Sequence, residues 1–397
     1  MKIGINKNPK TVKRDIFFNF IFNVFLRAKL NELDKQALKY LIALGLLRGI
    51  GSVRARNILA HFGDVKSVFE NQEELIQLIP GKNKLSTEEI SEALNRAEEE
   101  MKWAEENNVK VISYLDGAYP YRLKNLHDHP LVLYYKGAAN LNYRKVIGIV
   151  GTRKASKYGE SVVNEIMEVV APYKPLVISG LAYGVDKMAH QAALNNELET
   201  IGVLGHGLHT IYPSVHRGLA NKMESQGGLL TEFLSGSKFE KENFPKRNRI
   251  VAGMLDALIV VETKRKGGSM ITADIAFAAN REVFAVPGNI GQTNSEGCNY
   301  LIRLLKSQIL DNPTEFPKQM GWGNLDELPE NAQFELPLDL NEDEKSIIEL
   351  LQKSKEMSID QLCIQLQRNS AFLSAKLLEL EFKGLIIQRP GKIYCLS

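Results

Sequence analysis

The sequence has little cysteine, little net charge and no long apolar run. Among its 397 residues, the three cysteines Cys298, Cys363 and Cys395 lie far apart. This scarcity argues against a disulfide framework and against a cysteine-rich zinc module, and it fits a reducing cytoplasm. The chain carries 50 Lys and Arg against 47 Asp and Glu, so it is neither a disordered polyelectrolyte nor a uniformly basic protein. Any nucleic-acid site must therefore be a local basic patch.

No uninterrupted apolar run reaches the roughly 18 residues that a membrane-spanning helix needs. Residues 1–32 superficially resemble a secretion signal, because basic residues precede the apolar stretch Ile16–Leu26. However, Asn19 and Asn23 interrupt that stretch, and no small-x-small cleavage site follows it. We therefore interpret residues 1–32 as an unassigned N-terminal extension and expect a cytoplasmic protein without a membrane partner.

The rest of the chain divides into four regions by composition. Residues 33–108 have apolar residues at helical spacing, whereas residues 109–313 alternate between strand-like and helix-like segments. Residues 314–340 are acidic, contain Pro317, Pro329 and Pro337, and predict a poorly packed tether. Residues 341–397 predict a small helical unit that ends in a hairpin.

The region 109–313 predicts an α/β fold. Its short β-branched runs are Val146–Val150, Leu176–Ile178, Thr200–Leu204, Leu229–Phe233, Ala257–Val261 and Val283–Val286. Helices are expected over Gly159–Ala171, Val185–Asn195, Val215–Gln226 and Ser269–Asn280. Near-continuous apolar strands that alternate with helices indicate a mainly parallel sheet with helices on both faces. Right-handed crossovers then bring all the strand-to-helix loops to one end of the sheet.

Those loops are rich in glycine and basic residues. They are Gly151–Ser156, Ser179–Asp186, Gly205–His209, Ser235–Arg249, Glu262–Ser269 and Pro287–Asn289. Glycine turns that lead into helix N-termini expose N–H groups and a positive dipole end, and both favour phosphate oxygens. Arg153 is placed to add a bidentate phosphate contact. One such loop would only indicate a tight turn, but six in succession predict a phosphate site.

The usual nucleotide and metal motifs are missing from these loops. Gly205-His206-Gly207 lacks the third glycine of a dinucleotide site, and Gly267-Gly268-Ser269 lacks the lysine of a P-loop. NAD, FAD and ATP hydrolysis are thus disfavoured, and no cofactor is expected. His206, His209 and His216 have no carboxylate or cysteine partner in a metal-binding pattern, so no metal site is expected.

The stretch Gly236–Arg249 combines positive charge with aromatic rings. Its cations are Lys238, Lys241, Lys246, Arg247 and Arg249, and Phe239 and Phe244 lie between them. Single-stranded nucleic acid requires both features, since cations hold its backbone and rings stack on its unpaired bases. The spacing equally allows Phe244 to staple a helix that starts at Pro245, with the cations in solvent.

The flanking regions carry weaker signals for DNA contact. Gly49-Ile50-Gly51 links two helices through a hairpin that can grip a phosphate without reading sequence, and Arg54 and Arg56 would assist. The region 341–397 has the order of a winged helix, but its eight Lys and Arg balance eight Asp and Glu. Because a duplex binder should be more basic, we expect this unit to contact protein, with DNA as the alternative.

Several segments together resemble the DNA-processing protein A family, also called DprA or Smf. They are Gly151-Thr152-Arg153, Ser179–His190, Val203–Pro213, Asn243–Gly253, Lys266–Ala273 and Phe284–Ile290, in order through about Tyr119 to Leu310. The resemblance implies a Rossmann-like domain, preceded by a helix-hairpin-helix domain and followed by a winged helix. It further implies a bacterial, non-enzymatic homodimer that binds single-stranded DNA and helps to load RecA onto it during natural transformation.

The resemblance also implies particular site residues. Arg153 matches the DNA-contacting arginine of the family, and Lys241 and Phe244 match its lysine and aromatic contacts, which favours base stacking by Phe244. With the loop residues, the expected DNA-binding set is Gly151, Thr152, Arg153, Ser179, Gly180, Lys241, Phe244, Arg247, Arg249, Gly268 and Ser269. The expected dimer surface within Gly297–Leu310 consists of Tyr300, Leu301, Ile302, Leu304 and Leu305. Tyr183, His209 and His216 depart from the family's usual residues.

An enzymatic alternative comes from related Rossmann-like proteins that cleave nucleoside monophosphates at the N-glycosidic bond. These phosphoribohydrolases carry a P-G-G-x-G-T-x-x-E loop with a catalytic carboxylate. The nearest equivalent here is Gly267–Asp274, in which only the first half matches and Asp274 is the stand-in for the carboxylate.

Overall fold

The structure is a computed structural model that describes residues 35–79, 85–322, 340–354, 356–389 and 391–396. The predicted extension 1–32 and most of the predicted tether, residues 323–339, lie outside the described residues. The chain divides into two compact units, residues 1–102 and 103–397. Within the described residues, no helix has both the length and the apolar character needed to cross a membrane.

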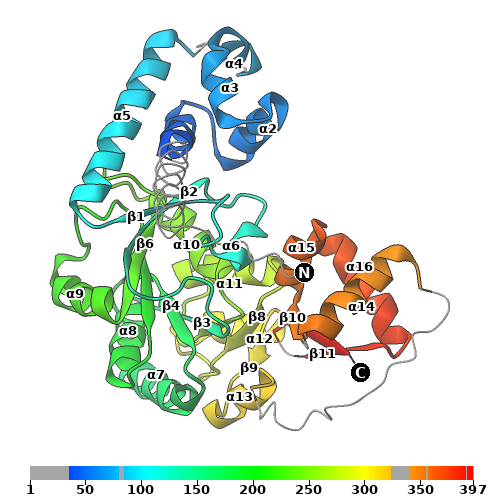
Figure 1. Cartoon of the computed structure of the whole chain (residues 1–397). Coiled ribbons are helices and arrows are strands. Elements are labelled where there is room, and N and C mark those ends of the chain that lie inside the picture. The colour runs from blue at the N-terminus through cyan, green and yellow to red at the C-terminus, as the bar shows by residue number, and fades with distance from the viewer. Residues whose placement is uncertain (1–34, 80–84, 323–339, 355, 390, 397) are drawn as a thin grey trace, which may run out of the picture. The chain divides into compact units, whose positions relative to one another are not determined.

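The first unit is helical, as predicted. Residues 35–46 form a helix, and α2 (Ser52–Phe62), α3 (Val65–Glu70), α4 (Gln72–Leu78) and α5 (Thr87–Glu106) follow it (Figure 1). Buried Leu44, Leu59 and Phe69 contribute to its core. The hairpin before α2 turns at Gly49, whose φ of 79° suits a residue without a side chain. Arg54 Nη1 donates to the Gly49 carbonyl at 2.5 Å, so this arginine closes the turn.

The second unit is built on a nine-stranded sheet in the order β1-β2-β6-β5-β4-β3-β7-β8-β9. The strands are β1 (Lys110–Ser113), β2 (Val132–Gly137), β3 (Val146–Val150), β4 (Leu176–Ser179), β5 (Thr200–Val203), β6 (Gly227–Thr231), β7 (Ala257–Val260), β8 (Glu282–Ala285) and β9 (Gln308–Ile309). From β6 to β9 all neighbours pair in parallel, whereas β1 with β2 and β2 with β6 pair antiparallel. The prediction of a mainly parallel sheet is confirmed, with β1 and β2 added at one edge.

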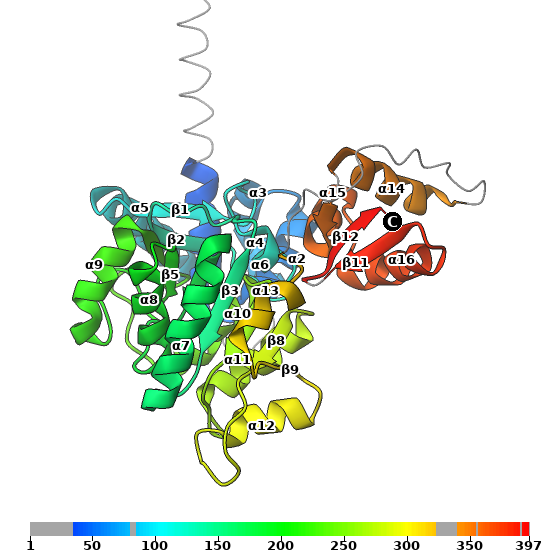
Figure 2. The same ribbon diagram turned by 90° about the horizontal axis from the view of Figure 1, so that it is seen from below.

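Helices cover both faces of this sheet (Figures 1 and 2). One face carries α7 (Lys157–Val170), α8 (Val185–Asn195) and α9 (Arg217–Ser225), and the other carries α10 (Asn243–Gly253) and α11 (Gly268–Ala278). Alternate residues of β3 enter different cores, since Ile147 and Ile149 pack with α7 and α8 while Val146 and Val150 pack with α10 and α11. Burial on both sides explains why the central strands have near-continuous apolar sequences.

The predicted tether is wrong for its first residues, which are packed rather than loose. Here η3 (Pro313–Glu315) and α13 (Phe316–Gln319) follow β9. Phe316 is fully buried against Phe284 of β8, with ring centroids 5.0 Å apart, and Trp322 packs edge-on against Phe316. Prolines suggested an extended linker, but the two aromatic rings supply enough apolar surface to hold this segment on the sheet domain.

The C-terminal part is a winged helix, as predicted. It comprises α14 (Glu342–Ser354), β10 (Glu356–Ser358), α15 (Ile359–Leu366), α16 (Ser370–Phe382), β11 (Ile386–Arg389) and β12 (Ile393–Leu396), with a sheet ordered β10-β12-β11. A capping box at Ser358 and Gln361 begins α15. Leu351, Leu362, Leu373, Leu377 and Leu380 lie in its buried core.

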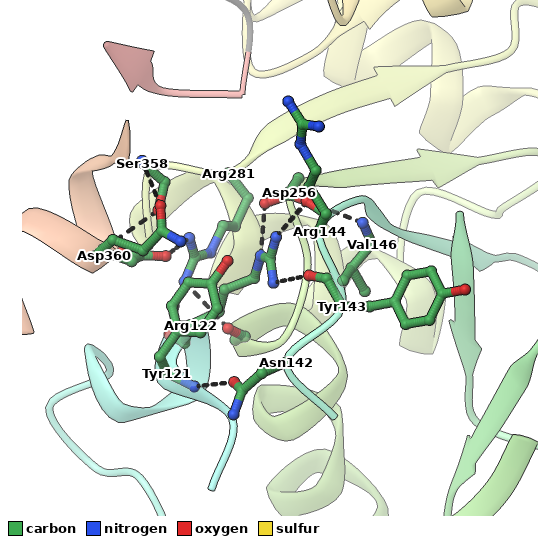
Figure 3. Close-up of polar contacts among 12 residues, drawn as sticks. Tyr121, Arg122, Asn142, Tyr143, Arg144, Val146, Asp256, Arg281, Ser358 and Asp360 are labelled. Carbon is green, nitrogen blue, oxygen red and sulfur yellow. Dashed lines mark hydrogen bonds and ion pairs between the residues drawn. The ribbon is translucent and has the colours of Figure 1, made fainter. Parts of the chain in front are cut away.

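Buried polar contacts join the winged helix to the sheet domain (Figure 3). Asp360 at the start of α15 accepts hydrogen bonds from Arg281 and Asn125, and the Asp360 and Arg281 side chains are each only 7% exposed. Arg281 also donates to the carbonyls of Arg122, in α6 (Tyr121–Lys124), and of Gly253. Arg122 in turn pairs with Asp256 at 2.6 Å. The winged helix is therefore anchored to residues that also hold the sheet domain together.

Candidate nucleic-acid interface

A cavity of about 670 Å³ opens at the carboxyl ends of the parallel strands, where the loops were predicted to meet. Its volume suits a ligand of nucleotide size. Nine of the predicted DNA-binding residues line it: Gly151, Thr152, Arg153, Gly180, Lys241, Phe244, Arg247, Gly268 and Ser269. The structure thus brings together residues that are more than one hundred positions apart in the sequence.

Two glycines in the loop after β4 allow close approaches, Gly184 to the loop after β3 and Gly180 to α10. A Cβ atom at Gly184 would lie 2.2 Å from the Thr152 carbonyl oxygen, and the φ of Gly184 is +74°. A Cβ atom at Gly180 would lie 2.3 Å from the Arg247 guanidinium. Gly184 has no room for a side chain, and a side chain at Gly180 would displace the Arg247 guanidinium, so both glycines determine the shape of the cavity wall.

Positive charge is concentrated on the exposed part of the cavity lining. Arg153, Lys241 and Lys264 are exposed, and Lys264 belongs to the loop that leads into α11. Helix α11 begins at Gly268 without a side-chain cap and without an acidic residue in its first turn. Its first N–H groups and its dipole therefore add to the attraction of this surface for anions.

Arg247 has a structural environment, unlike the exposed cations. It is 5% exposed and donates hydrogen bonds to the carbonyls of Gly180 and Val203. Asp186 lies nearby, and its Oδ2 accepts hydrogen bonds from the N–H groups of Gly180 and Ala182. Burial raises the pKa of Asp186, although the Arg247 charge opposes that shift, and burial lowers the pKa of Arg247. Arg247 was predicted to contact DNA, but these hydrogen bonds indicate that it holds two loops in place.

Three aromatic rings lie on one side of the cavity. Phe244 lies in the first turn of α10, Phe239 belongs to the preceding loop, and Tyr212 follows the loop after β5. The Arg153 guanidinium lies 5.8 Å from the centre of the Phe244 ring. Phe244 was predicted as a contact from its motif, and Phe239 belongs to the stretch predicted from its cations and rings, whereas Tyr212 was missed. The only signal for Tyr212 was its position just after the third glycine loop.

Two predicted residues do not line the cavity. Ser179 is fully buried, and its hydroxyl donates to the Ile149 carbonyl at 2.6 Å. Arg249 pairs with Glu232 and donates to the Asp128 carbonyl. Ser269 does line it, but its hydroxyl donates to Thr263 Oγ1 at 2.6 Å. Ser179 and Arg249 therefore hold the loops rather than face a ligand, and the Ser269 hydroxyl is already used in a contact within its own loop.

Asp274, the stand-in for a catalytic carboxylate, also lies outside the cavity lining. Its side chain is 52% exposed and pairs with Lys306 at 2.7 Å. Among the residues that line the cavity, Asp186 is the one carboxylate, and backbone N–H groups hold it. The lining therefore offers no solvent-facing general acid or nucleophilic carboxylate.

The histidines predicted to be unusual support neighbouring loops. His209 Nδ1 accepts a hydrogen bond from Gly236 N at 2.9 Å, and His216 Nδ1 lies 3.0 Å from the Leu181 carbonyl oxygen. The ring of Tyr183, which is 45% exposed, packs edge-on against His216. Throughout the part of the chain that the structure describes, no group of three or more His, Cys, Asp or Glu is arranged to hold a metal ion.

The predicted dimer surface is only partly on the surface. In α12 (Glu296–Arg303), Leu301 is 1% exposed and belongs to the core of the sheet domain, so its inclusion was wrong. Tyr300 and Ile302 are half-buried against the same core. Leu304 and Leu305 are 43% and 86% exposed, and Ile309 of the edge strand β9 is 44% exposed. The exposed apolar residues of the predicted region Gly297–Leu310 are therefore Leu304, Leu305 and Ile309, and we refer to these three as the patch.

Comparison with known proteins decides the family. Residues 110–321 match the family model described as DNA recombination-mediator protein A, and residues 332–392 match the DprA winged helix domain. Protein Smf of Escherichia coli is 34% identical over 303 residues, which cover 73% of this chain and 78% of that protein. The chain belongs to the DNA recombination-mediator protein A family.

Other members of the DNA recombination-mediator protein A family support this assignment. Protein Smf of Synechocystis is 31% identical over 392 residues, covering 89% of this chain and 98% of that protein. The X-ray structure of DNA processing protein A from Streptococcus pneumoniae has a TM-score of 0.61 at 29% identity, covering 70% of this chain and 95% of that one. DNA processing protein A from Helicobacter pylori, whose structure concerns a single-stranded DNA binding mode, has a TM-score of 0.50 at 26% identity. The match covers 54% of this chain and 96% of that one.

Proposed function

We propose that the cavity binds single-stranded DNA without chemical conversion, and that the protein acts in DNA processing in the cytoplasm during natural transformation. The observation that carries this proposal is the meeting of exposed cations, an uncapped helix N-terminus and aromatic rings in one cavity. Cations and N–H groups suit the sugar–phosphate backbone, and the rings suit unpaired bases. The single-stranded DNA binding mode of the Helicobacter pylori relative supports the same reading.

The cations of the cavity carry the affinity in this proposal. Neither Arg153 nor Lys241 forms an ion pair within the described residues, so both charges remain available to phosphates. Contacts to phosphates and to ring faces do not depend on base identity, so we expect binding with little sequence preference. Binding should weaken steeply as salt rises, because each neutralised phosphate releases counterions.

The test is fluorescence anisotropy of an oligo-dT strand with Arg153→Ala and Lys241→Ala over a series of NaCl concentrations. Each variant should bind at least several-fold more weakly and should lower the salt slope by about one. Lys222→Ala, which removes a charge from the exposed surface of α9, is the matched control and should behave like the original protein. Full affinity in both cavity variants, with unchanged circular dichroism, would rule out this site.

Delivery of the strand to RecA is the second part of the proposal. On single strands coated with a single-strand-binding protein, purified RecA should form filaments faster in the presence of this protein than in its absence. Arg153→Ala should lose this stimulation if the strand must first enter the cavity. Equal filament formation with and without the protein would remove this part and leave DNA binding untouched.

We also propose that the protein forms a homodimer and is not a phosphoribohydrolase. The exposed patch Leu304, Leu305 and Ile309 adjoins the open edge of the sheet at β9, which suits self-association. Asp274 pairs with Lys306 away from the cavity, which argues against its catalytic use. Incubation with nucleoside monophosphates should release no free base, and release that Asp274→Ala abolishes would reverse this conclusion.

A further inference from the structure

Tyr212, Phe239 and Phe244 form a compact cluster of rings at the cavity wall. The ring centres of Tyr212 and Phe239 are 4.4 Å apart, those of Phe239 and Phe244 are 5.4 Å apart, and those of Tyr212 and Phe244 are 6.3 Å apart. The planes of all three pairs are steeply inclined, between 53° and 66°. The rings therefore meet at their edges, and their faces are not used up by stacking on one another.

The three rings differ in how much of their surface faces solvent. Tyr212 is 47% exposed and Phe239 is 46% exposed, whereas Phe244 is half-buried. Phe244 packs closely on the backbone at Gly205, where a Cβ atom would lie 3.1 Å from its ring, and the Arg153 guanidinium lies 5.8 Å from its ring centre. Phe244 therefore supports the cluster, and the accessible aromatic surface belongs to Phe239 and Tyr212.

The loop that carries Phe239 is held in place before any ligand arrives. Gly236 N donates to His209 Nδ1 at 2.9 Å, and the Ser237 hydroxyl donates to the Leu234 carbonyl at 2.7 Å. The ring of His206 lies 5.6 Å from that of Phe239. A fixed loop that presents a large apolar ring to solvent gains nothing from that exposure in the isolated chain, and such exposed apolar groups commonly mark a binding surface.

We propose that Phe239 and Tyr212 form a base-stacking subsite beside Phe244, occupied by unpaired nucleobases of a strand whose phosphates lie on Arg153 and Lys241. This inference rests on the proposed function and extends it by naming where the bases go. All four side chains line the same cavity, so one strand can contact the cations with its backbone and the rings with its bases. The subsite accepts any base, because every base has a π-face.

The test compares two strands of equal length, oligo-dT and an oligomer of abasic sites, by fluorescence anisotropy. Phe239→Ala and Tyr212→Ala should each bind oligo-dT roughly tenfold more weakly, about 1.4 kcal/mol, since each loses the stacking of one base. The same variants should bind the abasic strand within about twofold of the original protein. Tyr212→Phe keeps the ring and should match the original protein on both strands.

Two further measurements separate stacking from a change in folding. Phe277→Ala removes a ring of matching exposure, 47%, from the far end of α11 and should leave both affinities unchanged. A 2-aminopurine base in the strand should lose fluorescence when it stacks on the protein, and Phe239→Ala should reduce that quenching. Melting temperatures of all variants are measured in parallel.

The possible failures are distinguishable. If Arg153→Ala weakens binding but Phe239→Ala and Tyr212→Ala bind oligo-dT normally, the subsite is wrong and the proposed function stands. If the ring variants lose the same factor on both strands, the rings support the loop instead of stacking on bases, and the subsite is again wrong. If Arg153→Ala binds oligo-dT normally, the proposed function itself fails.

Discussion

Arg153 and Arg247 line the same cavity but have different surroundings. Arg153 is exposed beside Phe244, whereas Arg247 is enclosed by the carbonyls of Gly180 and Val203 and by Asp186. In the sequence the two residues look alike, since each is a cation next to a glycine loop or an aromatic residue. Which side of α10 faces inward depends on packing against α11 and the sheet, and that packing could not be read from the local spacing.

His190 gives the sheet domain a defined sensitivity to acid. It is fully buried, and its Nδ1 lies 2.7 Å from Thr200 Oγ1. The Thr200 hydroxyl already donates to the Val177 carbonyl, so the His190 ring must donate through Nδ1–H in its neutral form. Burial, followed by the charges of Arg247 and His216, lowers the pKa of His190 to about 3.

We therefore expect stability to fall as the pH is lowered from neutral. The pKa of His190 in the folded protein lies below its unfolded value of about 6.5. The stabilisation by neutral His190 is therefore complete above about pH 6.5 and is lost as the pH falls towards 3. At pH 5 the loss relative to pH 7 should be about 2 kcal/mol. Urea unfolding at pH 7, 6 and 5 measures it, and His190→Gln should show a flatter pH dependence. Parallel curves for the two proteins would contradict this account.

At the scale of elements, the six central strands and four helices were predictable because both faces of the sheet are covered. A strand buried on both sides must be apolar throughout, and this pattern is visible without any partner. Strands β1 and β2 were missed because they pair antiparallel outside the repeating strand–helix order. The segment Pro313–Trp322 was missed because its packing depends on contacts of Phe316 and Trp322 with residues distant in the sequence.

The patch Leu304, Leu305 and Ile309 allows a direct test of the homodimer. Leu305→Arg adds a charge at a position that is 86% exposed, so it should not disturb the folded protomer but should separate two protomers. We expect a shift from dimer to monomer in sedimentation velocity, and a weaker apparent affinity for long single strands because two linked cavities bind with a higher effective concentration.

Leu115→Arg is the control for this experiment. Leu115 is 65% exposed and lies after β1, away from the patch. This variant should keep the oligomeric state and the DNA affinity of the original protein. A Leu305→Arg protein that sediments like the original would show that self-association uses another surface.

At the scale of the whole chain, the ion pair of Asp360 with Arg281 holds the winged helix on the sheet domain. Both groups are nearly buried, so removal of one leaves the other without a counter-charge. Breaking a buried pair in this way commonly costs about 3–5 kcal/mol. We expect Asp360→Ala to accelerate hydrogen exchange in α6 and α15. Asn125 at the end of α6 and Asp360 at the start of α15 are hydrogen-bonded to each other, so both helices lose this contact.

Two further variants make this test specific. Arg281→Met combined with Asp360→Leu removes both charges and should recover part of the protection, because no unpaired charge remains. Asp343→Ala breaks the exposed pair with Arg368 on the winged helix and should change exchange in α6 and α15 very little. Unchanged exchange in Asp360→Ala would show that other contacts carry the docking.

Helix α10 connects the aromatic rings of the cavity with the contact that holds the winged helix on the sheet domain. Phe244 lies in its first turn, and the carbonyl of its last residue, Gly253, accepts a hydrogen bond from the same Arg281 that holds Asp360. An α-helix of eleven residues is a stiff rod about 16 Å long, so tilting one end displaces the other. A displacement of the winged helix would thus be passed through Gly253 to Phe244. If that displacement changes the affinity for DNA, DNA binding must change the docking of the winged helix by the same free energy.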